Sequence, residues 1–429
     1  MSFTPSRTVG RWLSALTLVS AASMPLVACD DDGDSDSGGG GAAGGGAGGA
    51  GGGGGANLAV GFQPITLPEQ HEAVSEFVFL PGDSNEFLLL EKFGRVVHYR
   101  LEGDSATALG EFTVEGVHAD SDCGLIAAAF DPDWANNQSI YFAHCINAQG
   151  SGVYRHTFDG TTYDGVGTRQ GTVIEFDDPR AERSWHSVGD IGFDPQGVMW
   201  VLSGEKTFPD NSQNPENQLG AVVRIVPDAD GGYTPASDNP FLDQMGFDPA
   251  IYAYGLRSPW RGLLDAAGRL WVGDVGAEDF EEVNLVPPGG GQNFGWGVCE
   301  GPCDEAGLTN PVAHWDRDFE HPYVFDDPDA PPRRVRVVWV GGPDRLGAPD
   351  RYDGLMDDTV LFGDMCMGFV RALTVSEGDA ITSDRHVGHM QGISQISQGP
   401  DGFLYATTYG ECVTNADNQG GGLWRLVLR

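Results

Sequence analysis

The sequence predicts an all-β fold and, within that class, a six-bladed β-propeller. After residue 57 there is little of the 3.6-residue periodicity of amphipathic helices, and short apolar runs alternate with turns rich in Gly, Pro, Asn and Asp. A strand–turn–strand pattern recurs at 191–201, 263–272 and 396–405, and a version with a longer turn lies at 129–142. Units repeated every few tens of residues are typical of propellers.

The turns explain why each unit reads as a pair of strands. In the first repeat, Asp194-Pro195-Gln196-Gly197 separates two apolar runs. Pro presets one turn dihedral, and Gly accepts the positive φ that closes the hairpin. The pattern defines six units, at about 74–104, 122–160, 187–228, 250–290, 333–376 and 392–429. Their unequal spacing places long loops on one face, where propellers usually build a site. Two unrelated β-sandwiches are the alternative interpretation.

The charge of the chain excludes some classes of partner. The 429 residues carry a formal net charge of −38, from 24 Lys and Arg against 62 Asp and Glu. Nucleic-acid binding needs a basic face that replaces counterions, so this balance argues against it, and it argues equally against adhesion to anionic lipid. The charge is compatible with an extracytoplasmic domain and with carboxylates that hold Ca²⁺, although solubility alone explains most of the acids.

The N-terminal residues are predicted to be an export signal. Arg7 and Arg11 precede an apolar stretch that closes with Leu26-Val27-Ala28-Cys29, which matches the bacterial lipobox. We therefore expect a lipoprotein signal peptide at 1–28, a lipidated Cys29 at the head of a flexible Asp- and Gly-rich tether at 29–56, and the propeller at 57–429. The protein would be held on a bacterial membrane only by its lipid, facing the periplasm or the cell surface. An ordinary signal peptide with an incidental Cys is the alternative.

The cysteine count agrees with export. Without Cys29, six cysteines remain, and an even number in an oxidising compartment suggests three disulfides. Fifteen pairings are possible in principle. We favour Cys123–Cys145, Cys299–Cys303 and Cys366–Cys412, because each pair falls within one unit or one loop. Zinc is a poor alternative, because Cys299 and Cys303 have no second Cys or His pair at finger spacing.

Six motifs follow one another along residues 58–429. They lie at 123–133, 185–205, 219–241, 252–259, 274–296 and 399–426. Among them are Tyr252-Ala253-Tyr254-Gly255-Leu256-Arg257-Ser258-Pro259 and Asn293-Phe294-Gly295-Trp296. In this order the motifs resemble those of the soluble pyrroloquinoline-quinone (PQQ) sugar dehydrogenases, the glucose/sorbosone dehydrogenase family. The resemblance implies a six-bladed propeller that oxidises aldose sugars to lactones at the anomeric carbon and passes the electrons to an external acceptor.

The resemblance also implies roles for individual residues. His186 would be the general base for the sugar hydroxyl, with hydride transfer to the quinone, and Arg257 would supply positive charge at the quinone oxygens. Asp122 would lie beside the cofactor, and Glu205 would accept hydrogen bonds from sugar hydroxyls. The alternatives are a structural histidine at 186, a salt bridge between blades at 257 and a surface role for Glu205.

Calcium is the second cofactor that the resemblance implies. The carbonyls of Gly276 and Ala277 would hold the Ca²⁺ that polarises the quinone, and Glu282 with the carbonyl of Phe294 would hold a structural Ca²⁺. A solvated turn is the alternative for Glu281 and Glu282.

The sequence departs from the family pattern at four places. Ser258 replaces an Asn, Ser187-Val188 replaces two glycines after the catalytic histidine, and Asp122 replaces a Gln. The stretch 391–395 lacks the arginines that grip PQQ in the family, for which Arg385, Arg333, Arg334 or Arg336 would have to substitute. Two other functions are therefore weighed: a non-enzymatic surface propeller that binds a protein or glycan, and a Ca²⁺-dependent lactonase.

Overall fold

The structure of the chain is a computed structural model that describes residues 58–82, 85–317, 337–345, 347–376, 378–410 and 419–429. Contacts divide the chain into two compact units, Met1–Gly55 and Ala56–Arg429, and every described residue lies in the second. The expected signal peptide, Cys29 and the tether lie outside the described residues, as do Cys412 and the arginines 333, 334 and 336. In the part that the structure describes, no helix is long and apolar enough to cross a membrane.

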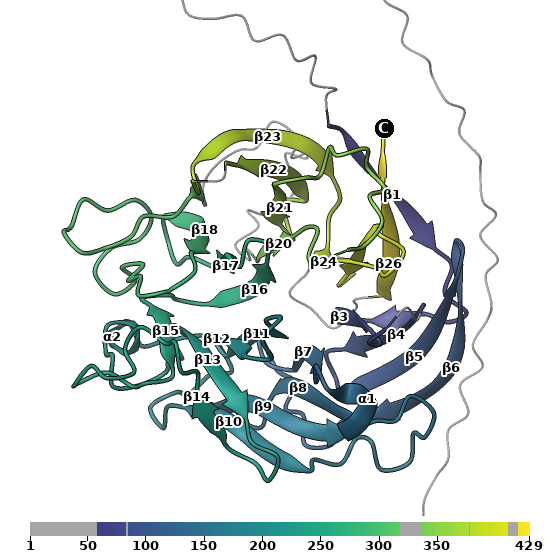
Figure 1. Ribbon diagram of the computed structural model, residues 1–429, viewed down its shortest axis with the longest axis horizontal. Coiled ribbons are helices and arrows are strands. Elements are labelled where there is room, and N and C mark those ends of the chain that lie inside the picture. The colour runs from purple at the N-terminus through teal and green to yellow at the C-terminus, as the bar shows by residue number, and fades with distance from the viewer. Residues whose placement is uncertain (1–57, 83–84, 318–336, 346, 377, 411–418) are drawn as a thin grey trace, which may run out of the picture. The chain divides into compact units, whose positions relative to one another are not determined.

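The second unit is built of β-strands, which confirms the all-β prediction (Figure 1). Two four-residue helices, α1 (Trp134–Asn137) and α2 (Pro209–Ser212), interrupt the described strands. Four sheets use strands that follow one another along the chain. The first contains β3 (Val74–Phe79), β4 (Glu86–Glu91), β5 (Arg95–Glu102) and β6 (Ser105–Thr113). The second contains β7 (Leu125–Phe130), β8 (Ser139–Cys145), β9 (Gly150–Thr157) and β10 (Gly171–Asp177). The third contains β11 (Val188–Phe193), β12 (Met199–Ser203), β13 (Ala221–Pro227), β14 (Tyr233–Pro235) and β15 (Ile251–Tyr254). The fourth contains β16 (Pro259–Leu264), β17 (Leu270–Asp274), β18 (Phe280–Val286) and β19 (Ala313–Asp316).

The fifth sheet has nine strands and consists of two runs. One run is β20 (Val338–Gly341), β21 (Thr359–Asp364), β22 (Phe369–Val375) and β23 (Ile381–His389). The other is β24 (Ile393–Gln398), β25 (Leu404–Thr408), β26 (Gln419–Leu428) and β1 (Val60–Ile65), with β2 (His71–Glu72) also paired to β26. A single parallel pair, Gly341 with Ile396, joins the runs. The repeats had not placed β1 in the last unit, where it pairs antiparallel with β26 along its whole length.

The first strands of the four sheets and of the two runs of the fifth sheet enclose the middle of the second unit. β3 packs against β7, β7 against β11, β11 against β16, β16 against β20, β20 against β24, and β24 against β3 again, which closes a ring (Figure 1). Apolar side chains fill the spaces between neighbouring sheets. Phe112 of the first sheet, for example, packs against Phe142 of the second, and Phe77 packs edge-on against Tyr405 of β25. Burial of such side chains contributes roughly 1.5–3 kcal/mol each.

A buried guanidinium connects the strands of the ring. Arg261 of β16 is fully buried, and its Nε donates to the carbonyl of Ser394 at 2.9 Å. Its Nη2 donates to the carbonyls of Ser75 at 2.6 Å and Ile126 at 3.2 Å. Its Nη1 lies 3.7 Å from Oδ1 of Asp190. One side chain therefore reaches β24, β3, β7 and β11 from β16.

A second buried group continues this network. Glu76 of β3 accepts hydrogen bonds from the backbone N–H of Ala128 at 2.8 Å and from Nε2 of Gln395 at 2.9 Å. Burial raises the pKa of Glu76 well above its ordinary value, and the carboxylate of Asp190 raises it further, whereas Arg261 opposes the shift. Arg261 is the cation that offsets both carboxylates in the middle of the ring.

We predict that Arg261→Met destabilises the protein strongly. The change leaves Asp190 and Glu76 buried without their cation, for which a cost of about 3–5 kcal/mol is typical. Equilibrium urea unfolding measures it. Arg100→Met is the matched control, because Arg100 pairs with Glu86 at the surface and its loss should leave the urea midpoint nearly unchanged. Equal midpoints for the two variants would contradict the role given to Arg261.

Candidate active site

The predicted site residues gather at one face of the ring. Asp122, His186 and Arg257 each lie in the loop that comes shortly before an inner strand, namely β7, β11 and β16. β17 is antiparallel to both β16 and β18, so the loop from β17 to β18, which holds Gly276, returns to the face at which β16 begins. The topology therefore brings these four residues to the same face.

His186 forms the centre of the site. The residue is buried and has a φ of +48°, a backbone conformation that costs free energy in a non-glycine residue and often marks a functional position. Its Nδ1 lies 2.6 Å from Oε1 of Glu205, which is also buried. Its Nε2 makes no hydrogen bond to the described residues. Because a carboxylate at Nδ1 holds the proton on that nitrogen, Nε2 is left as the basic atom.

Arg257 is joined to His186 through Glu205. The backbone N–H of Glu205 donates to the carbonyl of Arg257 at 2.9 Å. The guanidinium lies 5.3 Å from the ring centre of Trp296, and burial lowers its pKa. Its Nε is buried without a hydrogen-bond partner among the described residues, as is Oε2 of Glu205. Arg257 forms no ion pair with the described residues, so a salt bridge between blades does not explain it, and Glu205 is not on the surface.

Two arginines bind consecutive carbonyls of the loop between β17 and β18. Nη1 of Arg257 donates to the carbonyl of Val275 at 2.8 Å, and Nη1 of Arg317 donates to the carbonyl of Gly276. Arg317 also pairs with the buried Glu281, at 2.8 Å, whose other oxygen accepts the N–H of Gly276 at 3.0 Å. The Gly276 carbonyl does not fit the calcium expected there, because Arg317 already binds it.

The rest of this loop wraps around a carboxylate. The backbone N–H groups of Ala277, Glu278, Asp279 and Phe280 all point at Glu300, at 2.6–3.2 Å from its Oε1. A run of N–H groups aimed at one anion fixes the loop conformation. Ala277 is therefore held by its N–H, and a role of its carbonyl toward calcium stays a prediction.

The second expected calcium position lies nearby. Glu282 is buried on β18 rather than in a solvated turn, and burial raises its pKa. Its two oxygens accept hydrogen bonds from Gly301 N–H at 2.7 Å and Asn284 Nδ2 at 3.1 Å. Phe294 is buried in the loop that follows β18. In the described ranges, no group of three or more His, Cys, Asp or Glu side chains is arranged to hold a metal ion, and calcium at Glu282 and Phe294 stays a prediction.

A comparison with protein families identifies the chain. A family model described as Glucose / Sorbosone dehydrogenase matches residues 72–414, which span the ring and the site. The chain belongs to the glucose/sorbosone dehydrogenase family. The resemblance based on six motifs is therefore confirmed.

Individual members of the family are distant from this chain. It is 26% identical over 335 residues to the aldose sugar dehydrogenase YliI of Escherichia coli strain K12, which covers 77% of this chain and 85% of that protein. It is 24% identical over 255 residues to quinoprotein glucose dehydrogenase B of Acinetobacter calcoaceticus, covering 53% and 51%. The PQQ-bound aldose sugar dehydrogenase of Streptomyces coelicolor superimposes with a TM-score of 0.64 at 20% identity, covering 86% of this chain and 98% of that one. This structural likeness shows the fold.

The charges around His186 fit an anionic quinone of the kind that the resemblance implies. Arg257 offers an unpartnered, buried N–H, as described above. On the side of Asp122, whose Oδ2 accepts the N–H of His186 at 3.3 Å, Lys92 donates to the carbonyl of Ser121. Burial lowers the pKa of Lys92, and Asp122 opposes that shift. Lys92 therefore offsets the acid that replaces the family's Gln.

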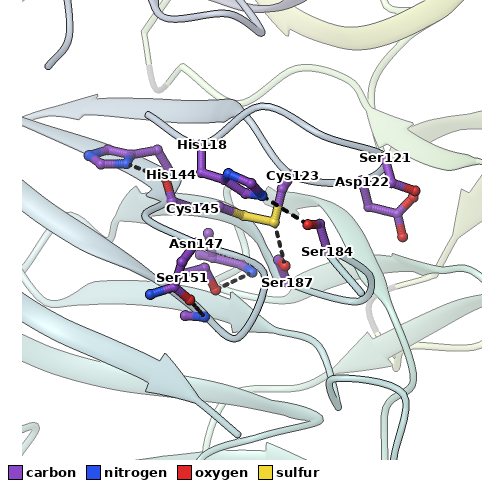
Figure 2. The surroundings of a disulfide bond; sticks show 12 residues. His118, Ser121, Asp122, Cys123, His144, Cys145, Asn147, Ser151, Ser184 and Ser187 are labelled. Carbon is purple, nitrogen blue, oxygen red and sulfur yellow. Dashed lines mark hydrogen bonds between the residues drawn. A yellow bond between two sulfur atoms is a disulfide. The ribbon is translucent and has the colours of Figure 1, made fainter. Parts of the chain in front are cut away.

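A disulfide holds this side of the site (Figure 2). Cys123–Cys145 ties the loop of Asp122 to the end of β8, as predicted, and the hydroxyl of Ser187 donates to Sγ of Cys123 at 3.1 Å. The predicted Cys299–Cys303 bridge is also present. The third predicted pair includes Cys412, which lies outside the described residues, so that pairing stays a prediction.

The stretch 391–395, where the resemblance implies arginines, leads into β24 (Ile393–Gln398) in the ring of inner strands. Ser394 and Gln395 belong to the network in the middle of the ring, where they bind Arg261 and Glu76. An arginine at either position would bring a further charge into that buried network. Arg385 lies on β23, the edge strand of its run and far in the strand order from β20, so the structure does not place it as a substitute.

A buried lysine that sequence reasoning missed lies behind His186. Lys206 is fully buried, and its Nζ donates to the hydroxyls of Ser187 at 3.0 Å and Ser151 at 3.1 Å. Burial lowers its pKa to about 8. Lys206 and Thr207 have φ values of +59° and +70°, so the strained backbone at His186 has strained neighbours. The only signal in the sequence was a lysine directly after Glu205 in a chain poor in cations.

We predict a pH-dependent stability that Lys206 controls. The unfolded lysine keeps a pKa near 10.5, whereas the folded one is about 8, so between these values the unfolded state binds more protons and stability rises with pH. The rise from this one group is up to roughly 3 kcal/mol. Urea unfolding of wild type and Lys206→Met at pH 7 to 10 measures it. The free energy of unfolding of wild type minus that of Lys206→Met should increase as the pH rises, because only wild type carries the titrating lysine. A difference that stays constant with pH would contradict the shift.

Proposed function

We propose that this protein oxidises aldose sugars to lactones with PQQ as its cofactor. The observation that carries the proposal is the pairing of His186 with Glu205 directly beside Arg257, at the face where the inner strands begin. Base, orienting carboxylate and cation are the groups needed to remove a proton from a hydroxyl and a hydride from the carbon that bears it. Family membership and the aldose sugar dehydrogenase relatives support the same activity.

The residues would divide the chemistry as follows. Nε2 of His186 takes the proton of the anomeric hydroxyl, which becomes the lactone carbonyl as the hydride leaves the same carbon. PQQ, when bound, would supply the two-electron acceptor for that hydride, and an external acceptor would take up the electrons. Glu205 holds the imidazole through Nδ1 and is a positioning residue, with its second oxygen still able to accept a sugar hydroxyl. Arg257 places positive charge beside the cofactor.

We propose further that the fold is a six-bladed propeller. The two runs of the nine-stranded sheet share one pair of residues, and Trp339 of one run lies in the same apolar cluster as Leu404 and Ala406 of the other. Such packing between runs is how the other sheets meet their neighbours, which supports counting the runs as separate blades.

The remaining parts of the proposal come from the sequence. A structural Ca²⁺ at Glu282 and Phe294, export by residues 1–28 and a lipid anchor at Cys29 complete it, so that the sugar and the electron acceptor meet the protein outside the cytoplasm.

We predict that His186→Ala loses activity while keeping the fold. With PQQ and a reducible dye, kcat for aldoses should fall by about 10²–10⁴-fold, the usual contribution of a general base. Glu205→Gln should lower kcat more than it changes KM, because it misplaces the imidazole without removing it. His314→Ala, at an exposed position of β19, is the matched control. If wild type reduced the dye with no aldose, the proposed activity would be wrong. Full activity of His186→Ala would contradict the role of His186 as general base.

A further inference from the structure

The face of the ring contains a cation that the sequence motifs did not assign, Arg317. Its guanidinium binds the carbonyl of Gly276 and the carboxylate of Glu281. Its backbone N–H donates to the carbonyl of Asp279 at 2.9 Å, so the residue is attached to the loop between β17 and β18 at both ends. The pKa of Arg257 is lowered by burial and also by the positive charge of Arg317.

The groups around Arg317 form a binding site for a cation. Glu281 is fully buried, and an isolated carboxylate there would be costly. One of its oxygens accepts the N–H of Gly276, and the other pairs with Arg317 at 2.8 Å. A carboxylate and a carbonyl directed at one point are oxygen ligands of the type that Ca²⁺ prefers. A guanidinium satisfies the same two oxygens with directed N–H donors and stays charged at every accessible pH.

The loop between β17 and β18 leaves little freedom for calcium to replace Arg317. Its consecutive carbonyls, at Val275 and Gly276, each bind an arginine, and its following N–H groups bind Glu300. Calcium could bind the Gly276 carbonyl only if Arg317 were displaced, because otherwise two cations would lie at one carboxylate and beside Arg257.

We infer that Arg317 is the resident cation of this site and takes the place that calcium was expected to fill at Gly276. The role of Arg317 toward the cofactor rests on the proposed function: Arg317 and Arg257 would together supply the positive charge at the quinone. PQQ binding at this position then needs no divalent ion.

Calcium stoichiometry of the cofactor-free protein tests the inference without any activity. Equilibrium dialysis of ⁴⁵Ca²⁺ compares chelator-washed wild type, Glu281→Gln and Arg317→Met, with circular dichroism to check folding. We expect Glu281→Gln to bind as much Ca²⁺ as wild type, because no ion uses that carboxylate. Arg317→Met should bind one more Ca²⁺, and the double variant should lose it again.

Loss of one Ca²⁺ in Glu281→Gln would overturn the inference, as would a folded Arg317→Met that gains none. The comparison of Glu281→Gln with wild type decides the matter even if Arg317→Met does not fold.

PQQ binding, followed by its absorbance after dialysis, gives the second readout. Wild-type affinity should be the same in EGTA as in calcium, and Arg317→Met should weaken it roughly 10- to 100-fold, as expected for loss of a charged hydrogen-bonding partner. Wild-type affinity that disappears in EGTA and returns with calcium would overturn the inference. If no condition gives PQQ binding, the proposed function fails, while the dialysis experiment still decides which cation occupies the site.

Discussion

The rest of the structure depends on how the ring of inner strands is held at its centre. Six strands that meet around an axis leave carbonyls directed inward, and buried carbonyls need donors. Arg261 supplies them to three strands at once and lies beside Asp190 of a fourth. Because a guanidinium has five N–H donors in a rigid plane, one side chain can fix the relative positions of several strands of the ring.

Backbone strain is found at the face of the ring that contains His186. The backbone at His186, Lys206 and Thr207 adopts left-handed conformations, which persist only when the surrounding structure determines them. The disulfide beside Ser187 and the buried hydrogen bonds of Lys206 provide that support. These contacts hold the backbone that carries the imidazole, and the hydrogen bond between Nδ1 of His186 and Glu205 sets the orientation of the ring.

The fold could be predicted to the extent that it is local. Turns such as Asp194-Pro195-Gln196-Gly197 are encoded by adjacent residues, and so the strand pairs around them were correctly expected. The pairing of β1 with β26 joins opposite ends of the described chain, and no short-range pattern reports it. In the site, His186 and Glu205 were singled out separately, but their contact spans 19 positions and depends on the loop between β12 and β13. Arg317 and Lys92 act on backbone carbonyls, which carry no mark in the sequence.

The pairing of β1 with β26 has a consequence for biogenesis. The final sheet needs a strand from the beginning of the domain and a strand from its last residues, so no cotranslational intermediate can possess it. Until the residues of β26 are available, β1 has no partner and β25 has an exposed edge, which is prone to association with other chains. A chain that stops short by a dozen residues would still contain the inner strand β24, but it would lose the strand that pairs with both β1 and β25.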